Sequence, residues 1–133
     1  MGFLLDTNAF VDFFTGRYPK VVARIQRTAP EDLFLSSVVV AELRYGANRS
    51  VHRRSNHARI DAVVEELEAI DFDLRAATTY GGVRARLEAN GTPIGPNDML
   101  IAAQALSRGL TVVTDNTAEF ARVKGLKLAN WRR

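Results

Sequence analysis

The chain contains no cysteine, and this absence excludes two kinds of site. Among its 133 residues there is no thiol, so neither a disulfide framework nor a thiolate metal site can form. Small secreted domains usually depend on disulfides, so we expect a cytoplasmic protein. Long apolar runs are also missing, since none approaches the ~20 residues that a membrane-spanning helix needs. We therefore expect no association with a membrane.

Lysine and histidine are scarce as well. Only three of the 18 basic residues are lysines, and arginine is the side chain whose planar fork matches a phosphate group. With a net charge of +3 and a pI near 9.7, this composition favours a nucleic-acid partner, though only weakly. His52 and His57 are not spaced to share one helix face, which argues against a histidine zinc site.

Short apolar segments alternate with amphipathic ones along the chain. The expected strands are residues 3–5, 33–35, 70–72, 110–113 and 126–129, and several of them are apolar on all sides, as in a parallel sheet covered on both faces. The main helices expected between them span residues 37–47, 60–69, 74–89 and 97–108. Residues 38–40 could instead extend the second strand. We predict an α/β fold in a single domain spanning residues 1–133.

Four acidic residues stand out because their neighbours are apolar. Asp6 and Asp115 each follow a predicted strand, Asp98 opens a nearly all-apolar helix, and Glu42 lies at the edge of an apolar helix face. Each has a purely structural explanation: capping the next helix, stabilising a helix N-terminus, or pairing with a surface base such as Arg44. Most other acids lie in polar surroundings and are expected to be solvated: Asp61, Glu65, Glu66, Glu68, Glu88 and Glu119.

The strand order decides whether these acids can act together. In a parallel sheet, Asp6 and Asp115 emerge from the same edge, where the start of the Asp98 helix could also lie. Two carboxylates ~4 Å apart repel by roughly 4 kcal/mol at an effective dielectric near 20, so a cluster raises its pKa values or binds a cation. Oxygen-only ligands select Mg²⁺ or Mn²⁺. Such ions activate water and stabilise displacement at phosphorus.

Four segments, in this order, resemble the PIN-domain ribonucleases and, more narrowly, the VapC toxins of bacterial VapBC toxin–antitoxin pairs: LLDTN, SSVVVAELRYGA, GPNDMLIAAQAL and TVVTDNTAEF. The resemblance covers nearly the whole chain. It implies a three-layer α/β/α sandwich with a central, mostly parallel sheet. It also implies metal-dependent endonucleolytic hydrolysis of RNA that leaves a 5′-phosphate, a homodimer, and a VapB antitoxin whose C-terminal tail blocks the site.

Residue by residue, the resemblance implies a pocket for Mg²⁺ or Mn²⁺ formed by Asp6, Glu42, Asp98 and Asp115. Asp6 and Asp98 are expected to be direct ligands, and the other two to act directly or through water. The family's polar supporting positions match Thr7, Asn8, Thr114 and Asn116. The most basic stretch, residues 49–59, is either a solvated surface or a set of RNA contacts through Arg49, Arg53, Arg54 and Arg59.

Two other functions are considered from the same residues. An aspartate-nucleophile phosphatase could use Asp6, but such sites want a second acid two residues later, and that position is Asn8. A non-catalytic nucleotide-binding or receiver module is the other alternative. No glycine-rich dinucleotide motif follows the first strand and no P-loop motif occurs in the sequence, which argues against nucleotide binding.

Overall fold

The centre of the fold is a five-stranded sheet. A computed structural model describes residues 1–133 and gives the strand order β3-β2-β1-β4-β5. Every neighbouring pair is parallel, so the predicted mostly parallel sheet is wholly parallel. The strands are β1 (Phe3–Leu5), β2 (Leu33–Ser36), β3 (Glu68–Ile70), β4 (Thr111–Val113) and β5 (Lys127–Ala129).

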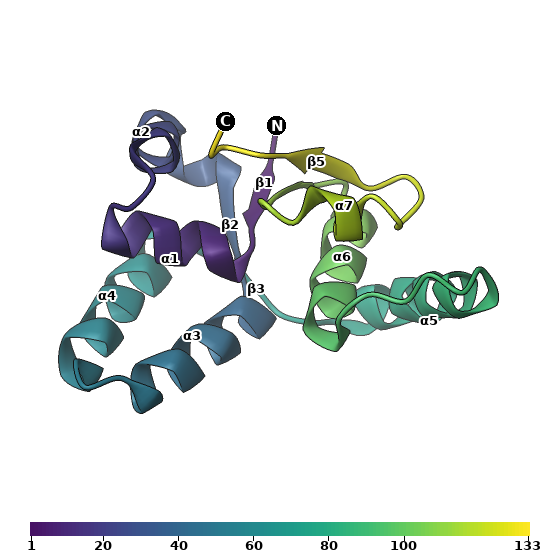
Figure 1. Cartoon of the computed structure of the whole chain (residues 1–133), viewed down its shortest axis with the longest axis horizontal. Coiled ribbons are helices and arrows are strands. Elements are labelled where there is room, and N and C mark those ends of the chain that lie inside the picture. The colour runs from purple at the N-terminus through teal and green to yellow at the C-terminus, as the bar shows by residue number, and fades with distance from the viewer.

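Helices cover both faces of this sheet. They are α1 (Thr7–Thr15), α2 (Pro19–Arg27), α3 (Ser37–Arg49), α4 (Arg53–Glu66), α5 (Leu74–Ala89), α6 (Pro96–Arg108) and α7 (Thr117–Phe120), with a 3-10 turn at Pro30–Asp32. Figure 1 shows α1 to α4 on one side of the β1–β2 pair and α5 to α7 on the other. The strand order runs outward from β1 to β3 and then returns to β4, so right-handed crossovers place the later helices on the opposite face. No helix has both the length and the apolar character needed to cross a bilayer.

The start of one helix and the position of one strand differ clearly from those expected. The helix predicted over residues 60–69 begins at Arg53, so most of the basic stretch is helical. The basic part of this helix lacks an apolar face, but contacts with α3 stabilise it. Arg44 of α3 donates to Asp61 at 2.6 Å and lies 3.0 Å from Nδ1 of His57. The third strand is Glu68–Ile70 rather than residues 70–72, because Ile70 pairs with Ser36 at the end of β2.

The ambiguity at residues 38–40 is resolved in favour of helix. The hydroxyl of Ser36 accepts the N–H of Val38 at 3.0 Å and caps α3. The same hydroxyl donates to the side-chain oxygen of the buried Gln104 on α6, whose amide donates to Ile70 O at 3.3 Å. A single buried polar cluster therefore ties α3 and α6 together beneath the sheet edge.

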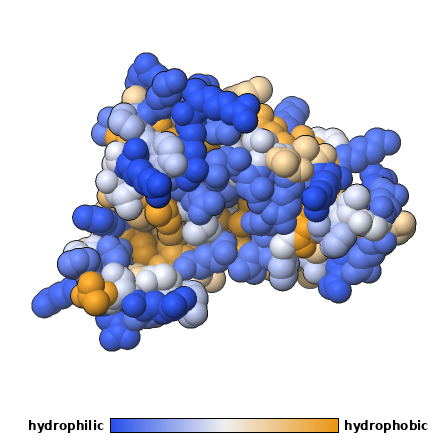
Figure 2. Space-filling model, in the orientation of Figure 1, coloured by the Kyte–Doolittle hydropathy of each residue, from blue (hydrophilic) through white to orange (hydrophobic).

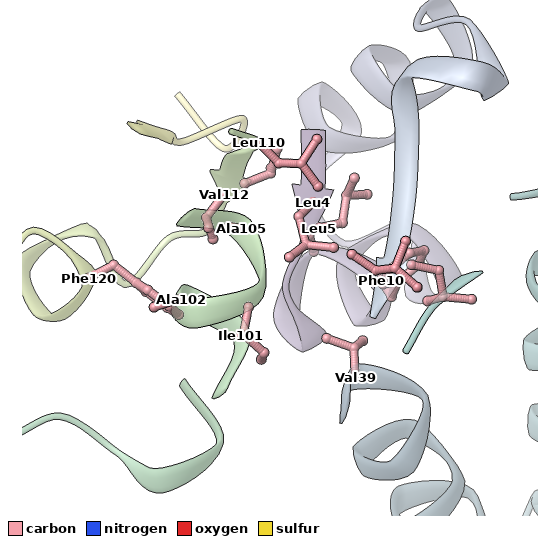
Figure 3. Close-up of a cluster of buried hydrophobic side chains, with 14 of the residues drawn as sticks. Leu4, Leu5, Phe10, Val39, Ile101, Ala102, Ala105, Leu110, Val112 and Phe120 are labelled. Atoms are coloured by element: carbon pink, nitrogen blue, oxygen red, sulfur yellow. The ribbon is translucent and has the colours of Figure 1, made fainter. Parts of the chain in front are cut away.

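The hydrophobic core surrounds β1 and β4. Leu4, Leu5 and Val112 are fully buried, and Figure 3 shows Leu4 and Leu5 between Phe10 of α1 and Val112 of β4. Strands β2 and β4 cover the two edges of β1, helices cover its faces, and the chain leaves β1 at Asp6. That place is the carboxyl edge, at the point where the strand order reverses and where open α/β sheets bind their ligands.

Candidate active site

Asp6 leaves the end of β1 and is buried. Its N–H donates to Val113 O at 3.0 Å, which holds it against β4. Its Oδ1 accepts the N–H of Ala9 at 2.9 Å, so it caps α1 as well as lying at the sheet edge. Burial raises the pKa of Asp6 to about 6, against the lowering effect of hydrogen bonds from Thr114 and Ala9. The nearby charge of Asp115 raises it further.

Asp98 lies in the first turn of α6 and is half-buried. Its pKa is raised to about 7, chiefly by burial. The charge of Glu119 and a hydrogen bond between the two carboxyl groups contribute next, and the charges of Asp6 and Glu42 contribute least. Glu119 shows the opposite behaviour: its pKa is lowered, chiefly because the N–H of Gly95 donates to it. Of these two carboxyl groups, Asp98 therefore has the higher pKa.

Glu42 reaches the same region from α3. The hydroxyl of Thr7, the first residue of α1, donates to Glu42 Oε1 at 2.6 Å. This contact joins the start of α1 to the middle of α3 and fixes the direction of the Glu42 carboxylate. Thr7 therefore orients an acid from a different element.

Asp115 is arranged differently from the other acids, because both of its oxygens have partners. Asn8 donates to Oδ1 at 3.2 Å, and Nη1 of Arg132 donates to Oδ2 at 2.9 Å. Arg132 also forms a fork with the buried Asp12, with Nε–Oδ2 at 2.7 Å and Nη2–Oδ1 at 3.0 Å. Its guanidinium lies 4.0 Å from the ring centroid of Tyr18. Asp115 acts on Asp6 through its charge while facing Arg132.

The acids are close enough to perturb one another but not to enclose an ion. No group of three or more His, Cys, Asp or Glu side chains is placed to hold a metal. The available donors are nevertheless all carboxylate oxygens, which suit a hard divalent cation. Such a cation would neutralise the repulsion among the acids of the site, which are Asp6, Glu42, Asp98 and Glu119. The chemistry of the donors fits Mg²⁺ or Mn²⁺.

Three residues of this region were not predicted. Glu119 was expected to be solvated but contacts Asp98 and Gly95. The sequence offered one clue to its position. Glu119 follows Asn116 by three residues, the spacing of a capping box at a helix start, and Asn116 does donate to Glu119. Asp12 and Arg132 had no distinguishing pattern, although Asp12 is only 4% exposed.

The predicted supporting residues lie near the acids, whereas the basic stretch lies mostly elsewhere. The hydroxyl of Thr114 accepts the N–H of Asn116 at 2.9 Å, and the region also includes Thr7 and Asn8. Among the basic residues, Arg59 lines a cavity of about 310 Å³ together with Thr7 and Glu42. The other three lie at the exposed turn between α3 and α4: Arg49, Arg53 and Arg54. Figure 2 shows apolar atoms in the hollow between α1 and α3.

Comparison with known proteins agrees with this architecture. The PIN domain profile matches residues 3–126. The chain belongs to the PIN-domain family. Within the PIN-domain family its relatives include the tRNA(fMet)-specific endonuclease VapC of Salmonella typhimurium, 38% identical over 97% of each chain. Ribonuclease VapC2 of Rickettsia felis is 36% identical over 98% of each chain.

Solved structures give the same result for this PIN domain. The DNA-bound VapBC structure from Salmonella typhimurium matches with a TM-score of 0.92 at 37% identity, over 98% of each chain. VapBC2 from Rickettsia felis bound to a promoter DNA fragment matches with a TM-score of 0.90 at 35% identity, over 98% of this chain and 99% of that one. The predicted PIN-domain α/β/α fold and the resemblance to VapC ribonucleases are confirmed.

Proposed function

We propose that this PIN-domain protein is the ribonuclease toxin of a VapBC-type pair, which hydrolyses RNA with Mg²⁺ or Mn²⁺ and is inhibited by a VapB-type antitoxin. The observation that carries the proposal is the group of acids at the carboxyl edge of the sheet, where burial and mutual repulsion raise the pKa of Asp6 to about 6 and of Asp98 to about 7. Such raised pKa values are typical of functional sites. Together with the similarity of this chain to VapC ribonucleases, they favour a cation-dependent nuclease.

Each acid has a separate task in this mechanism. Asp6 and Asp98 are the proposed metal ligands, one fixed by its capping bond to Ala9 and the other by its place in the first turn of α6. Glu42 completes the site in the direction set by Thr7. The bound cation supplies Lewis acidity toward the phosphate and an acidified water molecule. Asp115, with both oxygens occupied, orients water rather than ligating directly.

The substrate class and the partner follow from the relatives. Two VapC relatives, from Salmonella typhimurium and Shigella flexneri, are named tRNA(fMet)-specific endonucleases and are 38% and 40% identical to this chain. Initiator tRNA is therefore the first substrate to test. Solved relatives are VapBC complexes, some bound to DNA, which supports a DNA-binding antitoxin and a toxin–antitoxin hetero-oligomer. The toxin homodimer within it is what the family resemblance implies. The partly apolar cavity beside Thr7 and Glu42 offers the antitoxin a place next to the acids.

A cleavage assay with two site variants and one matched control tests the proposal. Asp6→Asn and Asp98→Asn should each lower Mg²⁺- or Mn²⁺-dependent cleavage of initiator tRNA by at least about 100-fold, because loss of groups that merely orient metal ligands already costs 10–100-fold. The control is Asp73→Asn. Asp73 caps α5 as Asp6 caps α1, with Oδ1 accepting an N–H at 2.9 Å, and asparagine caps equally well.

Asp73→Asn should cleave like the wild type, since its carboxylate is exposed and lies beside Ser107 and Arg108, at the opposite end of α6 from Asp98. Chelation of divalent ions should abolish cleavage by every protein. Undiminished cleavage by both site variants, or cleavage that survives chelation, would show that the site is wrongly assigned. Equal cleavage of unrelated RNA would support the nuclease activity and contradict the preference for tRNA.

A further inference from the structure

A basic cavity lies outside the acidic site, between α5, α6 and the segment after α7. Its volume is about 210 Å³, and no acidic residue lines it. The apolar part consists of Val83, Leu87, Leu106 and Val123, and the cationic part of Arg86, Arg122 and Lys124. Figure 1 shows α5 and α6 side by side beneath the segment that follows α7. Three like charges therefore surround one hollow that has room for a small anion.

These cations have no carboxylate partners within the protein. None of Arg86, Arg122 and Lys124 forms an ion pair. Arg122 donates one N–H to Pro93 O at 2.7 Å, and its remaining donors are free. On the same helix as Arg86, Arg84 has its partner, with Nε 3.0 Å from Glu88. The fold thus pairs the cation outside the cavity and leaves those that line it without an ion pair, although the charge of Arg122 acts on nearby Glu119.

The segment of residues 93–95 connects the cavity to the acidic site, because a residue that lines the cavity, Arg122, binds it. On the cavity side, Arg122 donates to Pro93 O. On the other side, the N–H of Gly95 donates to Glu119, the carboxylate that shares a hydrogen bond with Asp98. A polyanion lying across this segment would meet the acids at one phosphate and the cations at another.

We propose that this cavity binds a backbone phosphate of the RNA substrate and holds the strand in place beside the acidic site. Arginine forks bind phosphate bidentately, and contacts of this kind position a nucleic acid without reading its sequence. The apolar residues leave room for the adjoining sugar. The inference rests on the proposed function, because it takes RNA as the anion that must approach a site crowded with carboxylates.

Two adjacent glycines of α5 provide a matched test. Gly82 lines the cavity and Gly81 does not. A Cβ at either position meets nothing within 4 Å, and a side chain in mid-helix should stabilise α5 relative to glycine. Gly82→Glu and Gly81→Glu therefore add the same charge to the same helix, but only Gly82→Glu places a carboxylate in the cavity.

Binding is measured as the fluorescence anisotropy of a labelled single-stranded RNA, in the inactive Asp98→Asn background without divalent ions. Each phosphate contact contributes about fivefold to affinity at 0.1 M salt relative to 1 M, so losing this one weakens binding about fivefold and reduces the salt slope by about 0.7. We expect this loss for Gly82→Glu and a change below about twofold for Gly81→Glu, whose added charge stays in solvent. Equal weakening by both variants would overturn the proposal, as would no effect of Gly82→Glu.

A second pair of variants removes charge instead of adding it. Arg86→Gln with Lys124→Gln should reproduce the loss of about fivefold, whereas Lys20→Gln with Arg27→Gln, the same charge change on α2, should not. Equal losses in the two pairs would reduce the effect to net charge and overturn the proposal. A wild-type protein that binds RNA but does not cleave it with Mg²⁺ or Mn²⁺ would refute the proposed function. The comparison of RNA affinities among these variants would still test the cavity.

Discussion

Replacing Asp6 with asparagine should stabilise the metal-free protein while abolishing its activity. Asp6 is 5% exposed, and burial raises its pKa from 3.8 to about 6. The folded state therefore holds this proton more tightly than the unfolded state does. A difference of about 2 pKa units corresponds to about 3 kcal/mol at pH 8, where the carboxylate is ionised in both states.

The sign follows from proton binding. Between pH 4 and pH 6 the folded protein binds more protons at Asp6 than the unfolded protein, so the free energy of unfolding falls as pH rises through this range. Asparagine keeps the oxygen that accepts the N–H of Ala9 and carries no charge. Because its amide must also be accommodated beside Thr114, we expect a net gain of about 1–3 kcal/mol at pH 8 and little gain at pH 4.

Urea unfolding at several pH values in the presence of a chelator measures this effect. The control is again Asp73→Asn, whose carboxylate is exposed and should give the same free energy of unfolding as the wild type. Added Mn²⁺ should stabilise the wild type by mass action and the Asp6→Asn protein much less. A variant that is no more stable than the wild type at pH 8 without metal would refute the reasoning from burial.

Three further variants test the packing around the site by urea unfolding at pH 7. Arg132→Met leaves the buried Asp12 without its partner and should cost about 3–5 kcal/mol; a cost below about 1 kcal/mol would mean that the pair is solvated. Gln104→Leu removes the acceptor of the Ser36 hydroxyl, at a cost of about 1–3 kcal/mol; unchanged stability would place water there. Phe120→Ala, fully buried in α7, should cost about 3–5 kcal/mol and lower the rate of RNA cleavage, because the adjacent residue contacts Asp98; full activity would contradict this link.

The parts of the fold that could be predicted are those in which the apolar pattern is local. The buried segments around Leu4, Leu35 and Val112 are strands, and Asp6, Asp98 and Asp115 stood out because apolar neighbours flank them. The convergence of three of the acids followed from one topological argument, the shared edge of parallel strands.

The remaining site residues depend on contacts between distant segments. Glu119 has polar neighbours in sequence, and its role arises from Gly95, 24 residues earlier. Asp12 looks like an exposed helical position until Arg132 folds onto it from 120 residues away. The start of α4 was missed for a similar reason, since its basic residues show no amphipathic pattern and the helix is held by Arg44 of α3. Local periodicity carries no information about such partners.

The fork between Arg132 and Asp12 also bears on how a cell makes this protein. Ribosomes synthesise Asp12 120 residues before its counter-charge, and until Arg132 emerges α1 would have to bury an uncompensated carboxylate. The segment that tethers Asp115 is the same late one. The nascent chain therefore cannot complete its acidic edge during most of translation.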